Sequence, residues 1–373
     1  MRRLAAVLFA AACCAGAATA TASPPQLAAR AWFVENVATG EVLASHEEST
    51  PMPIASITKL MTVLVVLDHH RLSDVVQVDP RVTKVGQESL NLRPGDTFTV
   101  RDLLKATLIQ SANDAADALA FSVAPDYGAF ADLMNAKAAD LGLTDSHFVR
   151  PDGLDTPDQY SSARDVTRLA RAAMRIPVVR EFVGETDDTI AGGRALHTWN
   201  DLLGVLPGVF GVKTGHTNEA GWSQVAADSG GGETIYATIL GSPSRWQRND
   251  DLTRLLVWGL SQYRTVEAIS ASRTYASARL PYGRPALGLV APQSLLEVVR
   301  VGHPLTERVV APTVVSLPVT QGQVLGRVEV WNGGHLLASR PLVASRSVPR
   351  PSAAGRVRWY TTRTVHHVLA FFT

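Results

Sequence analysis

The chain has 373 residues, 46% of them hydrophobic, which is enough to bury a sizeable core and, at roughly 150 residues per domain, to form two domains. Its 35 lysines and arginines nearly balance its 34 aspartates and glutamates. This balance excludes the strongly basic character typical of nucleic-acid-binding proteins, so we expect no nucleic-acid partner, and any attraction to a membrane must be local.

Residues 1–22 have the pattern of a secretory signal peptide. An arginine pair precedes an apolar stretch, and small residues then offer Ala-x-Ala sites that end at Ala20 or Ala22. The alternative, a membrane-spanning helix, needs about 20 apolar residues, more than this stretch has. The only cysteines, Cys13 and Cys14, lie inside the segment. We therefore expect a mature chain without a disulfide or a cysteine-based metal site.

The predicted elements after the signal peptide begin with a hairpin. Residues 29–50 alternate apolar and polar side chains around Thr39 and Gly40. Helical patterns, with apolar residues at spacings of three and four, follow from about Ser56 and at 100–123, 128–143 and 162–174. Strand patterns then occupy 210–217, 221–229 and 231–240, and a last helix covers 248–263. This order predicts an α+β fold, an antiparallel sheet covered by helices in which the two ends of the domain pair.

The remainder of the chain has a different composition and pattern of apolar residues. Short valine-rich runs separated by glycine and proline predict a small all-β domain at 265–345. Residues 346–373 predict a linker and an amphipathic helix, and no acidic residue follows Glu329. On this helix, Val357, Tyr360 and Thr364 share one side, and Arg356, Arg363 and His367 share the other. A helix lying in a membrane interface is the favoured interpretation, and a helix docked on the protein or an unstructured tail is the alternative.

Ser56 and Lys59 stand three residues apart where an apolar helical pattern opens. Alone, the pair is weak evidence for a reaction centre, because a serine is also an ordinary helix cap. On a helix, however, this spacing puts both side chains on one face, so Lys59 Nζ can reach Ser56 Oγ. A serine hydroxyl becomes a nucleophile only when a base takes its proton, and burial or a second cation can lower the pKa of a lysine enough for that task.

Two further motifs strengthen this interpretation. Lys213, Thr214 and Gly215 lie in a strand pattern, where the first two suit a substrate carboxylate and Gly215 would let a substrate backbone approach. Ser111 and Asn113 follow a helical apolar run, where a hydroxyl could relay a proton and an amide could hold a carbonyl or Lys59. Each motif alone also suits a turn or a strand end.

Together, Ser-x-x-Lys, Ser-x-Asn and Lys-Thr-Gly in this order are the signature of penicillin-binding proteins and serine β-lactamases. The chain resembles the low-molecular-mass penicillin-binding proteins of the D-alanyl-D-alanine carboxypeptidase type. The stretches that carry the resemblance are "IASITKLMT", "SANDAADALA", "FVRPDGLDTPDQYSSARDVTRLA", "GVFGVKTGHTNEAGWSQVAA" and "LLVWG". It predicts a catalytic domain at 27–264, and the β domain and cationic tail also match the layout of this family.

The resemblance implies roles for individual residues. Ser56 would attack the penultimate D-Ala carbonyl, Lys59 would act as base, and Ser111 and Asn113 would complete the relay and the substrate contacts. Lys213 and Thr214 would bind the terminal carboxylate, and the backbone N–H groups of Ser56 and His216 would form the oxyanion hole. The segment from Asp152 to Ser162 resembles the loop that shapes the floor of the site. An arginine would assist the carboxylate; Arg248 and Arg245 are the candidates, and we favour Arg248.

The predicted partners are peptidoglycan stem peptides, β-lactam antibiotics and, through the C-terminal helix, a membrane surface. We expect no cofactor and no metal, because no His-Glu-x-x-His pattern is present. The enzyme would act in the periplasm or on the outer face of the cytoplasmic membrane, peripherally attached. Trp199, Trp222 and Trp258 are predicted to belong to the core.

Three other functions compete with this interpretation. A β-lactamase shares the three motifs, but we see no glutamate-bearing loop that would activate water for fast deacylation. A DD-endopeptidase that cuts cross-links would differ in pocket shape and not in motif. A wall-binding protein with a silent site is the non-catalytic alternative, and the intact motifs argue against it.

Overall fold

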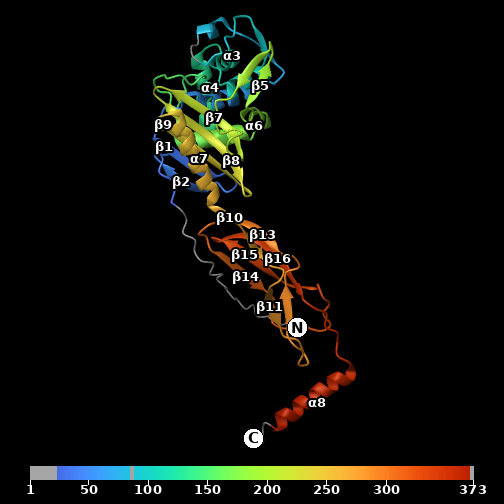
Figure 1. Ribbon diagram of the computed structural model, residues 1–373. Helices are drawn as coiled ribbons and strands as arrows, with labels where there is room; N and C mark the ends of the chain where they lie inside the picture. The colour runs from blue at the N-terminus through green and yellow to red at the C-terminus, as the bar shows by residue number, and fades with distance from the viewer. Residues whose placement is uncertain (1–22, 85–87, 370–373) are drawn as a thin grey trace. The chain divides into compact units, whose positions relative to one another are not determined.

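The computed structural model describes residues 23–84 and 88–369, so the predicted signal peptide lies outside the described residues. The chain divides into two compact units, an N-terminal unit that ends at Gln262 and a C-terminal unit that begins at Tyr263 (Figure 1). The second unit begins two residues before Thr265, where the sequence analysis starts the β domain.

A five-stranded antiparallel sheet forms the centre of the N-terminal unit, with the strand order β2-β1-β9-β8-β7. The first hairpin of the unit pairs with its last strand, since Ala31 lies opposite Leu240 and Asn36 lies opposite Ile235. The strands are β1 (Ala31–Asn36), β2 (Val42–His46), β7 (Val209–Thr217), β8 (Gly221–Gly230) and β9 (Glu233–Ser242). The predicted α+β fold, with the two ends of the domain paired in one sheet, is confirmed.

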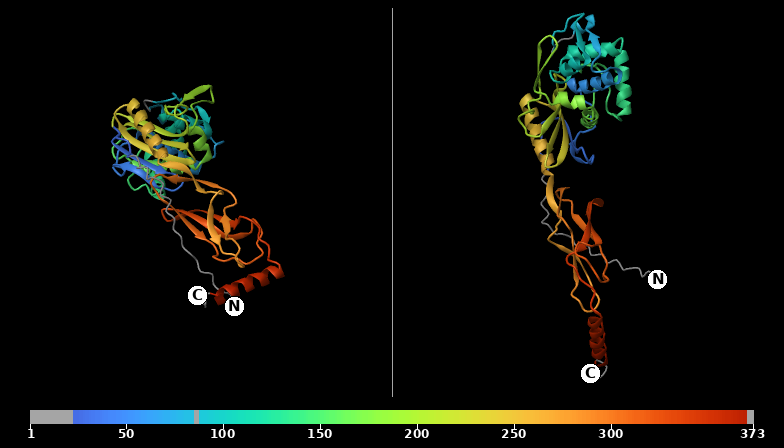
Figure 2. Two further views of the ribbon diagram at one scale, coloured as in Figure 1. Left: turned by 60° about the horizontal axis from the view of Figure 1, so that its bottom comes forward. Right: turned by 90° about the vertical axis from the view of Figure 1, so that its right-hand side faces the viewer.

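Helices cover both faces of this sheet, as its edge-on view in Figure 2 shows. Helix α7 packs on β8 and β9 from one face, and α5 packs on β1 and β9 from the other. α1 is buried along most of its length, which explains its nearly unbroken apolar sequence. The helices of the unit are α1 (Lys59–His69), α2 (Val100–Leu108), α3 (Asn113–Val123), α4 (Tyr127–Asp140), α5 (Ala163–Met174), α6 (Pro177–Val183) and α7 (Arg245–Ser261).

The prediction of one helical stretch at 100–123 is wrong in one respect, because the structure has two helices there. α2 ends at Leu108 and α3 begins at Asn113. Between them Ser111 has φ of 62°, a left-handed conformation that a helix cannot contain and that costs free energy in a residue other than glycine. Two short hairpins were also not predicted: β3 (Val75–Gln77) with β4 (Thr97–Thr99), and β5 (Asp187–Ile190) with β6 (Arg194–His197).

The C-terminal unit has an apolar β core, as predicted. A sheet in the order β11-β12-β16-β15-β14 is accompanied by the pair β10–β13. Valine, leucine and alanine side chains fill the core. The strands are β10 (Tyr263–Ile269), β11 (Thr274–Ala278), β12 (Leu287–Val290), β13 (Leu295–Arg300), β14 (Leu305–Val310), β15 (Val324–Asn332) and β16 (His335–Ala344).

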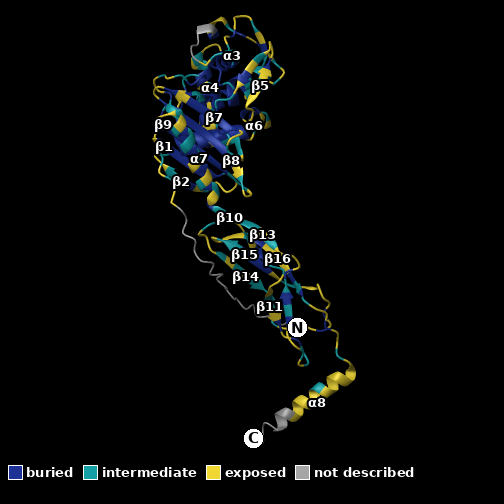
Figure 3. Cartoon of the chain, viewed as in Figure 1, coloured by how far each residue is buried: buried dark blue, intermediate teal, exposed yellow. Residues whose placement is uncertain are grey.

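Helix α8 (Ala353–Leu369) ends the described chain and is mostly exposed (Figure 3). Its Trp359 ring packs edge-on against Tyr282 at a centroid distance of 5.6 Å, whereas Val357 and Tyr360 are exposed. Among the helices that the structure describes, none is long and apolar enough to cross a membrane.

Candidate active site

Ser56 lies in a short 3-10 helix, Ala55–Thr58, that leads directly into α1. Lys59 is the first residue of α1, so both side chains share one face and Lys59 Nζ lies 2.7 Å from Ser56 Oγ. Ser56 is half-buried, whereas Lys59 is buried. Ser56 therefore presents its hydroxyl to solvent with an amine directly behind it, and it does not cap the helix that follows.

Lys59 is held by oxygen atoms from two distant parts of the chain. Its Nζ lies 2.6 Å from Asn113 Oδ1 and 2.5 Å from the Asp152 carbonyl oxygen. Burial lowers the pKa of Lys59 to about 8, although the negative charges of Asp152 and Asp117 oppose this effect. An amine with such a pKa is partly neutral near pH 7, where it can accept a proton from a hydroxyl group.

A second lysine–serine pair lies in the same site. Lys213 Nζ, from β7, lies 2.9 Å from Ser111 Oγ, in the turn between α2 and α3. Burial, followed by the positive charge of Lys59, lowers the pKa of Lys213 well below its ordinary value. The structure thus brings together five side chains: Ser56 from the short helix before α1, Lys59 from α1, Ser111 from the turn after α2, Asn113 from α3 and Lys213 from β7.

Two glycines allow the close packing that holds Ser56 in place. A Cβ on Gly215 would lie 2.5 Å from the Ile54 carbonyl oxygen, and one on Gly153 would lie 2.2 Å from that of Ala55. Real side chains do not tolerate such distances, so glycine is required at both positions. The sequence analysis expected Gly215 to make room for a substrate backbone. In the structure, the space that a Gly215 side chain would need is occupied by the protein's own backbone at Ile54.

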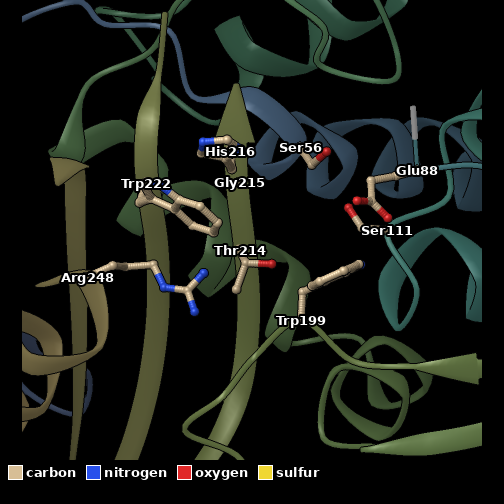
Figure 4. A pocket seen from close by; sticks show the side chains of 9 residues that line it. All are labelled: Ser56, Glu88, Ser111, Trp199, Thr214, Gly215, His216, Trp222 and Arg248. Atoms are coloured by element: carbon tan, nitrogen blue, oxygen red, sulfur yellow. The ribbon is translucent and has the colours of Figure 1, made fainter. Parts of the chain in front are cut away.

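A cavity of about 120 Å³ opens in front of these groups (Figure 4). The prediction that Trp199 and Trp222 are core residues is wrong, because both are half-buried and line this cavity. Glu88 was not predicted and also lines it. The complete lining comprises Ser56, Glu88, Ser111, Trp199, Thr214, Gly215, His216, Trp222 and Arg248.

Of the two candidate arginines, Arg248 lines the cavity and Arg245 is not among the lining residues. Arg248 Nη2 donates to Asp201 Oδ2 at 2.8 Å, and its guanidinium lies 5.7 Å from the centre of the Trp222 ring. Arg245 is held by the same carboxylate, Asp201, and lies over Trp199. Burial lowers the pKa of Arg248 to about 10, which still leaves a cation at neutral pH to meet an anion.

The His216 side chain faces the cavity from β7 and stacks on Trp222, with ring centroids 3.9 Å apart. Burial, followed by the charge of Arg248, lowers the pKa of His216, so its ring is neutral near pH 7. Its backbone N–H belongs to β7, the edge strand of the sheet. The ring contributes a flat wall to the cavity.

Behind Lys59 lies a group of buried carboxylates that the sequence did not reveal. Asp152 pairs with Arg150 at 2.5 Å, and Tyr127 donates to Asp117 at 2.5 Å. Burial, followed by the charge of Asp152, raises the pKa of Asp117 to about 7. No sequence pattern marks Asp117, because its nearness to Lys59 exists only in the folded chain. Within the described residues, no three His, Cys, Asp or Glu side chains cluster closely enough to hold a metal ion.

Residues 18–244 match the family model described as D-alanyl-D-alanine carboxypeptidase, and residues 263–350 match that of the penicillin-binding protein 5 C-terminal domain. The chain is 33% identical to the D-alanyl-D-alanine carboxypeptidase DacC of Escherichia coli, over 94% of this chain and 92% of the relative. It is 34% identical to DacB2 of Mycobacterium tuberculosis, over 64% of this chain and 84% of that protein.

Solved structures give the same result. Penicillin-binding protein 5 from Haemophilus influenzae matches with a TM-score of 0.64 and 26% identity, over 88% of this chain and all of that chain. Penicillin-binding protein D2 from Listeria monocytogenes, in its ampicillin-bound form, matches with a TM-score of 0.58 and 31% identity, over 63% of this chain and 100% of that chain. Sequence and fold thus both match D-alanyl-D-alanine carboxypeptidases and penicillin-binding proteins.

Proposed function

Because this chain belongs to the family of serine D-alanyl-D-alanine carboxypeptidases of the penicillin-binding type, we propose that it removes the terminal D-Ala of peptidoglycan stem pentapeptides through an acyl intermediate on Ser56. The observation that carries the proposal is the 2.7 Å contact between Ser56 Oγ and the buried amine of Lys59. With a pKa of about 8 for Lys59, roughly a tenth of the molecules carry it as a free base at pH 7. That fraction is enough for a base that acts within one site.

In the first step, Ser56 Oγ attacks the carbonyl carbon of the penultimate D-Ala while its proton passes to Lys59 Nζ. The carbonyl oxygen becomes an oxyanion, and the backbone N–H groups of Ser56 and His216 stabilise it. The asymmetric position of Lys59 supports this order of events, because its amine contacts Ser56 directly and Asn113 and Asp152 fix it from behind.

In the second half of acylation the bond between the carbonyl carbon and the D-Ala nitrogen breaks. The leaving nitrogen needs a proton, and Ser111 supplies it from the side of Lys213, whose Nζ lies 2.9 Å from the Ser111 hydroxyl. Thr214 and Arg248 bind the carboxylate of the departing residue, a role supported by their common place in the cavity lining. Lys213, which the sequence analysis also assigned to this carboxylate, is not among the lining residues, and its amine contacts Ser111.

Water then attacks the carbonyl carbon of the Ser56 ester and passes a proton to the Ser111–Lys213 pair, which lost one to the leaving amine. As the bond from that carbon to Ser56 Oγ breaks, Lys59 returns its proton to Ser56 Oγ. The segment from Asp152 to Ser162 shapes the floor on which this water lies. Its anchoring supports that role: the carbonyl oxygen of Asp152 contacts Lys59, and Gly153 packs against the backbone of Ala55. Penicillins acylate the same serine, and the ampicillin-bound relative from Listeria monocytogenes supports this extension.

The test is D-Ala release from a peptide ending in D-Ala-D-Ala, by the mature protein and by its Ser56→Ala variant. Release that disappears in Ser56→Ala and persists in Ser272→Ala, an exposed serine of the C-terminal unit, is the expected result. Equal release by Ser56→Ala and the unchanged protein would refute the acyl-serine mechanism. Products from cross-linked muropeptides separate a carboxypeptidase from an endopeptidase, and the lifetime of the penicillin adduct separates both from a β-lactamase.

We also propose that residues 1–22 direct the chain across the inner membrane and that the tail at 346–373 holds it on the outer face of that membrane. Arg356, Arg358 and Arg363 give α8 its charge, and the exposed Val357 and Tyr360 give it apolar area. The proposal predicts that removing residues 353–373 abolishes binding to anionic vesicles and leaves D-Ala release unchanged. Unchanged vesicle binding by the truncated protein would refute the anchor.

A further inference from the structure

Glu88 provides the only carboxylate among the residues that line the cavity of the active site. Its side chain is exposed, and none of the ion pairs formed between described side chains includes it. In Figure 4 it lies beside Ser111, and its carboxylate is directed toward the cavity. Its negative charge also acts on the buried Lys59 and Lys213, where it opposes the lowering of their pKa values, and its exposed carboxylate can meet a cation that enters with the substrate.

The backbone around Glu88 is firmly connected to the catalytic turn. The Glu88 carbonyl oxygen accepts a hydrogen bond from the Asn113 N–H at 2.7 Å. The neighbouring Asp114 is buried, and its carboxylate accepts three bonds from the segment after Glu88: Ser89 Oγ at 2.6 Å, Leu90 N at 3.1 Å and Leu92 N at 3.0 Å. One hydrogen bond thus ties the Glu88 backbone to Asn113, and three more tie the segment that follows Glu88 to Asp114, so the backbone at Glu88 is held next to the start of α3.

The cavity is consequently bipolar. Arg248 provides its cation on the side of β7 and β8, Glu88 provides its anion on the opposite side, and Ser56 lies between them (Figure 4). A peptide whose terminal carboxylate lies at Arg248 and Thr214, with its scissile carbonyl at Ser56, continues past Ser56 away from Arg248. Beyond the two D-Ala residues, the first long side chain of such a peptide belongs to the residue that precedes D-Ala-D-Ala.

We propose that Glu88 is a specificity-determining residue that favours stem peptides with a primary ammonium on the side chain of the residue preceding D-Ala-D-Ala. This inference rests on the proposed function, because it takes the carboxylate end of the substrate to be at Arg248. Lysine and diaminopimelate are the two sources of such an ammonium. Since Glu88 is exposed, solvent weakens the attraction, and we expect a preference of about 3- to 5-fold, typical of an exposed ion pair.

The experiment compares kcat/KM for D-Ala release from two peptides that differ only in the residue before D-Ala-D-Ala, which is lysine in one and Nε-acetyl-lysine in the other. The unchanged protein should prefer the lysine peptide about 3- to 5-fold at low salt, and the preference should shrink at high salt. A third peptide with diaminopimelate distinguishes the sources. Its rate equals that of the lysine peptide if Glu88 responds to the ammonium alone, and falls below it if Glu88 repels the neighbouring carboxylate.

Three variants complete the test. Glu88→Gln should bring the ratio of the two rates to about one, and Glu88→Lys should bring it below one. Glu185→Gln removes the same charge from an exposed residue outside the cavity lining and should keep the ratio of the unchanged protein. A ratio that Glu88→Gln leaves unchanged, even if both rates fall, would overturn the assignment of Glu88 alone. No release from any peptide by the unchanged protein would overturn the proposed function as well.

Discussion

The two units of this protein bury different kinds of side chain. Among the described residues, the C-terminal unit buries only one charged or polar side chain, Glu329, whereas the N-terminal unit buries the lysines, carboxylates, serines and amides of the active site. Burying such groups costs free energy unless each finds a partner, so a core that does so must be closely fitted. The difference indicates that the residues of the C-terminal core serve stability alone, whereas those of the N-terminal core must also position the reacting groups.

The largest expected effect comes from removing the buried amine. Lys59→Met preserves the volume of the side chain but takes away the proton acceptor at Ser56, so we expect penicillin acylation and D-Ala release to fall by about 10³. Penicillin labelling and a D-Ala assay measure both. Lys137→Met, which removes a surface lysine paired with Asp68, is the matched control and should change neither. Acylation at the normal rate by Lys59→Met would mean that another group is the base.

A backbone change should have the next largest effect. Gly153→Ala puts a Cβ 2.2 Å from the Ala55 carbonyl oxygen at φ of +84°, so Ser56 must move or the loop must shift. We expect a loss of stability of about 1–3 kcal/mol and a fall in D-Ala release of about 10².

Gly142→Ala is its control, because Gly142 also has a positive φ, +68°, yet nothing lies within 4 Å of the added Cβ. It should cost only about 1 kcal/mol, measured by chemical unfolding, with activity preserved. If the two alanine variants behave alike, the close approach of Gly153 to Ala55 has no functional importance.

The buried carboxylates predict a smaller, pH-dependent effect. Asp117 has a pKa raised to about 7, so the stability that its protonated form provides is lost as the pH rises from about 4 to about 7. The asparagine of Asp117→Asn does not titrate, so the variant should not lose this stability. Between pH 4 and pH 7, its free energy of unfolding should therefore rise by about 1–2 kcal/mol relative to that of the unchanged protein. Thermal unfolding at the two pH values tests this.

The same variant should also act on the reaction. Asp117 opposes the lowering of the Lys59 pKa, so its replacement by asparagine should shift the rise of acylation with pH, centred near pH 8 in the unchanged protein, to lower pH. A pH–rate profile identical to that of the unchanged protein would show that Asp117 does not influence Lys59.

The smallest effect on catalysis is expected in the C-terminal unit. Leu289→Ala removes a fully buried side chain from its core and should destabilise that unit by about 2–4 kcal/mol, with D-Ala release unchanged at temperatures where the unit remains folded. Leu296→Ala, at an exposed position of the same unit, should cost less than about 0.5 kcal/mol. A fall in release with Leu289→Ala under folding conditions would contradict the separation of the two cores.

Local patterns in the sequence determined most of the fold and the reaction centre. Alternation around Thr39 predicted the first hairpin, apolar spacing predicted α1, α4 and α5, and glycine-bounded strands predicted β7, β8 and β9. The Ser56–Lys59 contact also followed from sequence, because a spacing of three is a helical property that needs no knowledge of other segments.

The tertiary structure decided everything that depends on distant segments meeting. The break at Ser111 was missed because apolar residues recur at helical spacing on both sides of it. In the fold, Ser111 is left-handed, its hydroxyl contacts Lys213, and the Asn113 N–H that follows donates to the Glu88 carbonyl oxygen. Trp199 and Trp222 were predicted to be core residues, because an aromatic residue that lines a cavity has the same sequence signature as one that is buried in a core. Glu88 and Asp117 gave no signal in the sequence, because their place at the site is set by which elements pack together and not by neighbours in the chain.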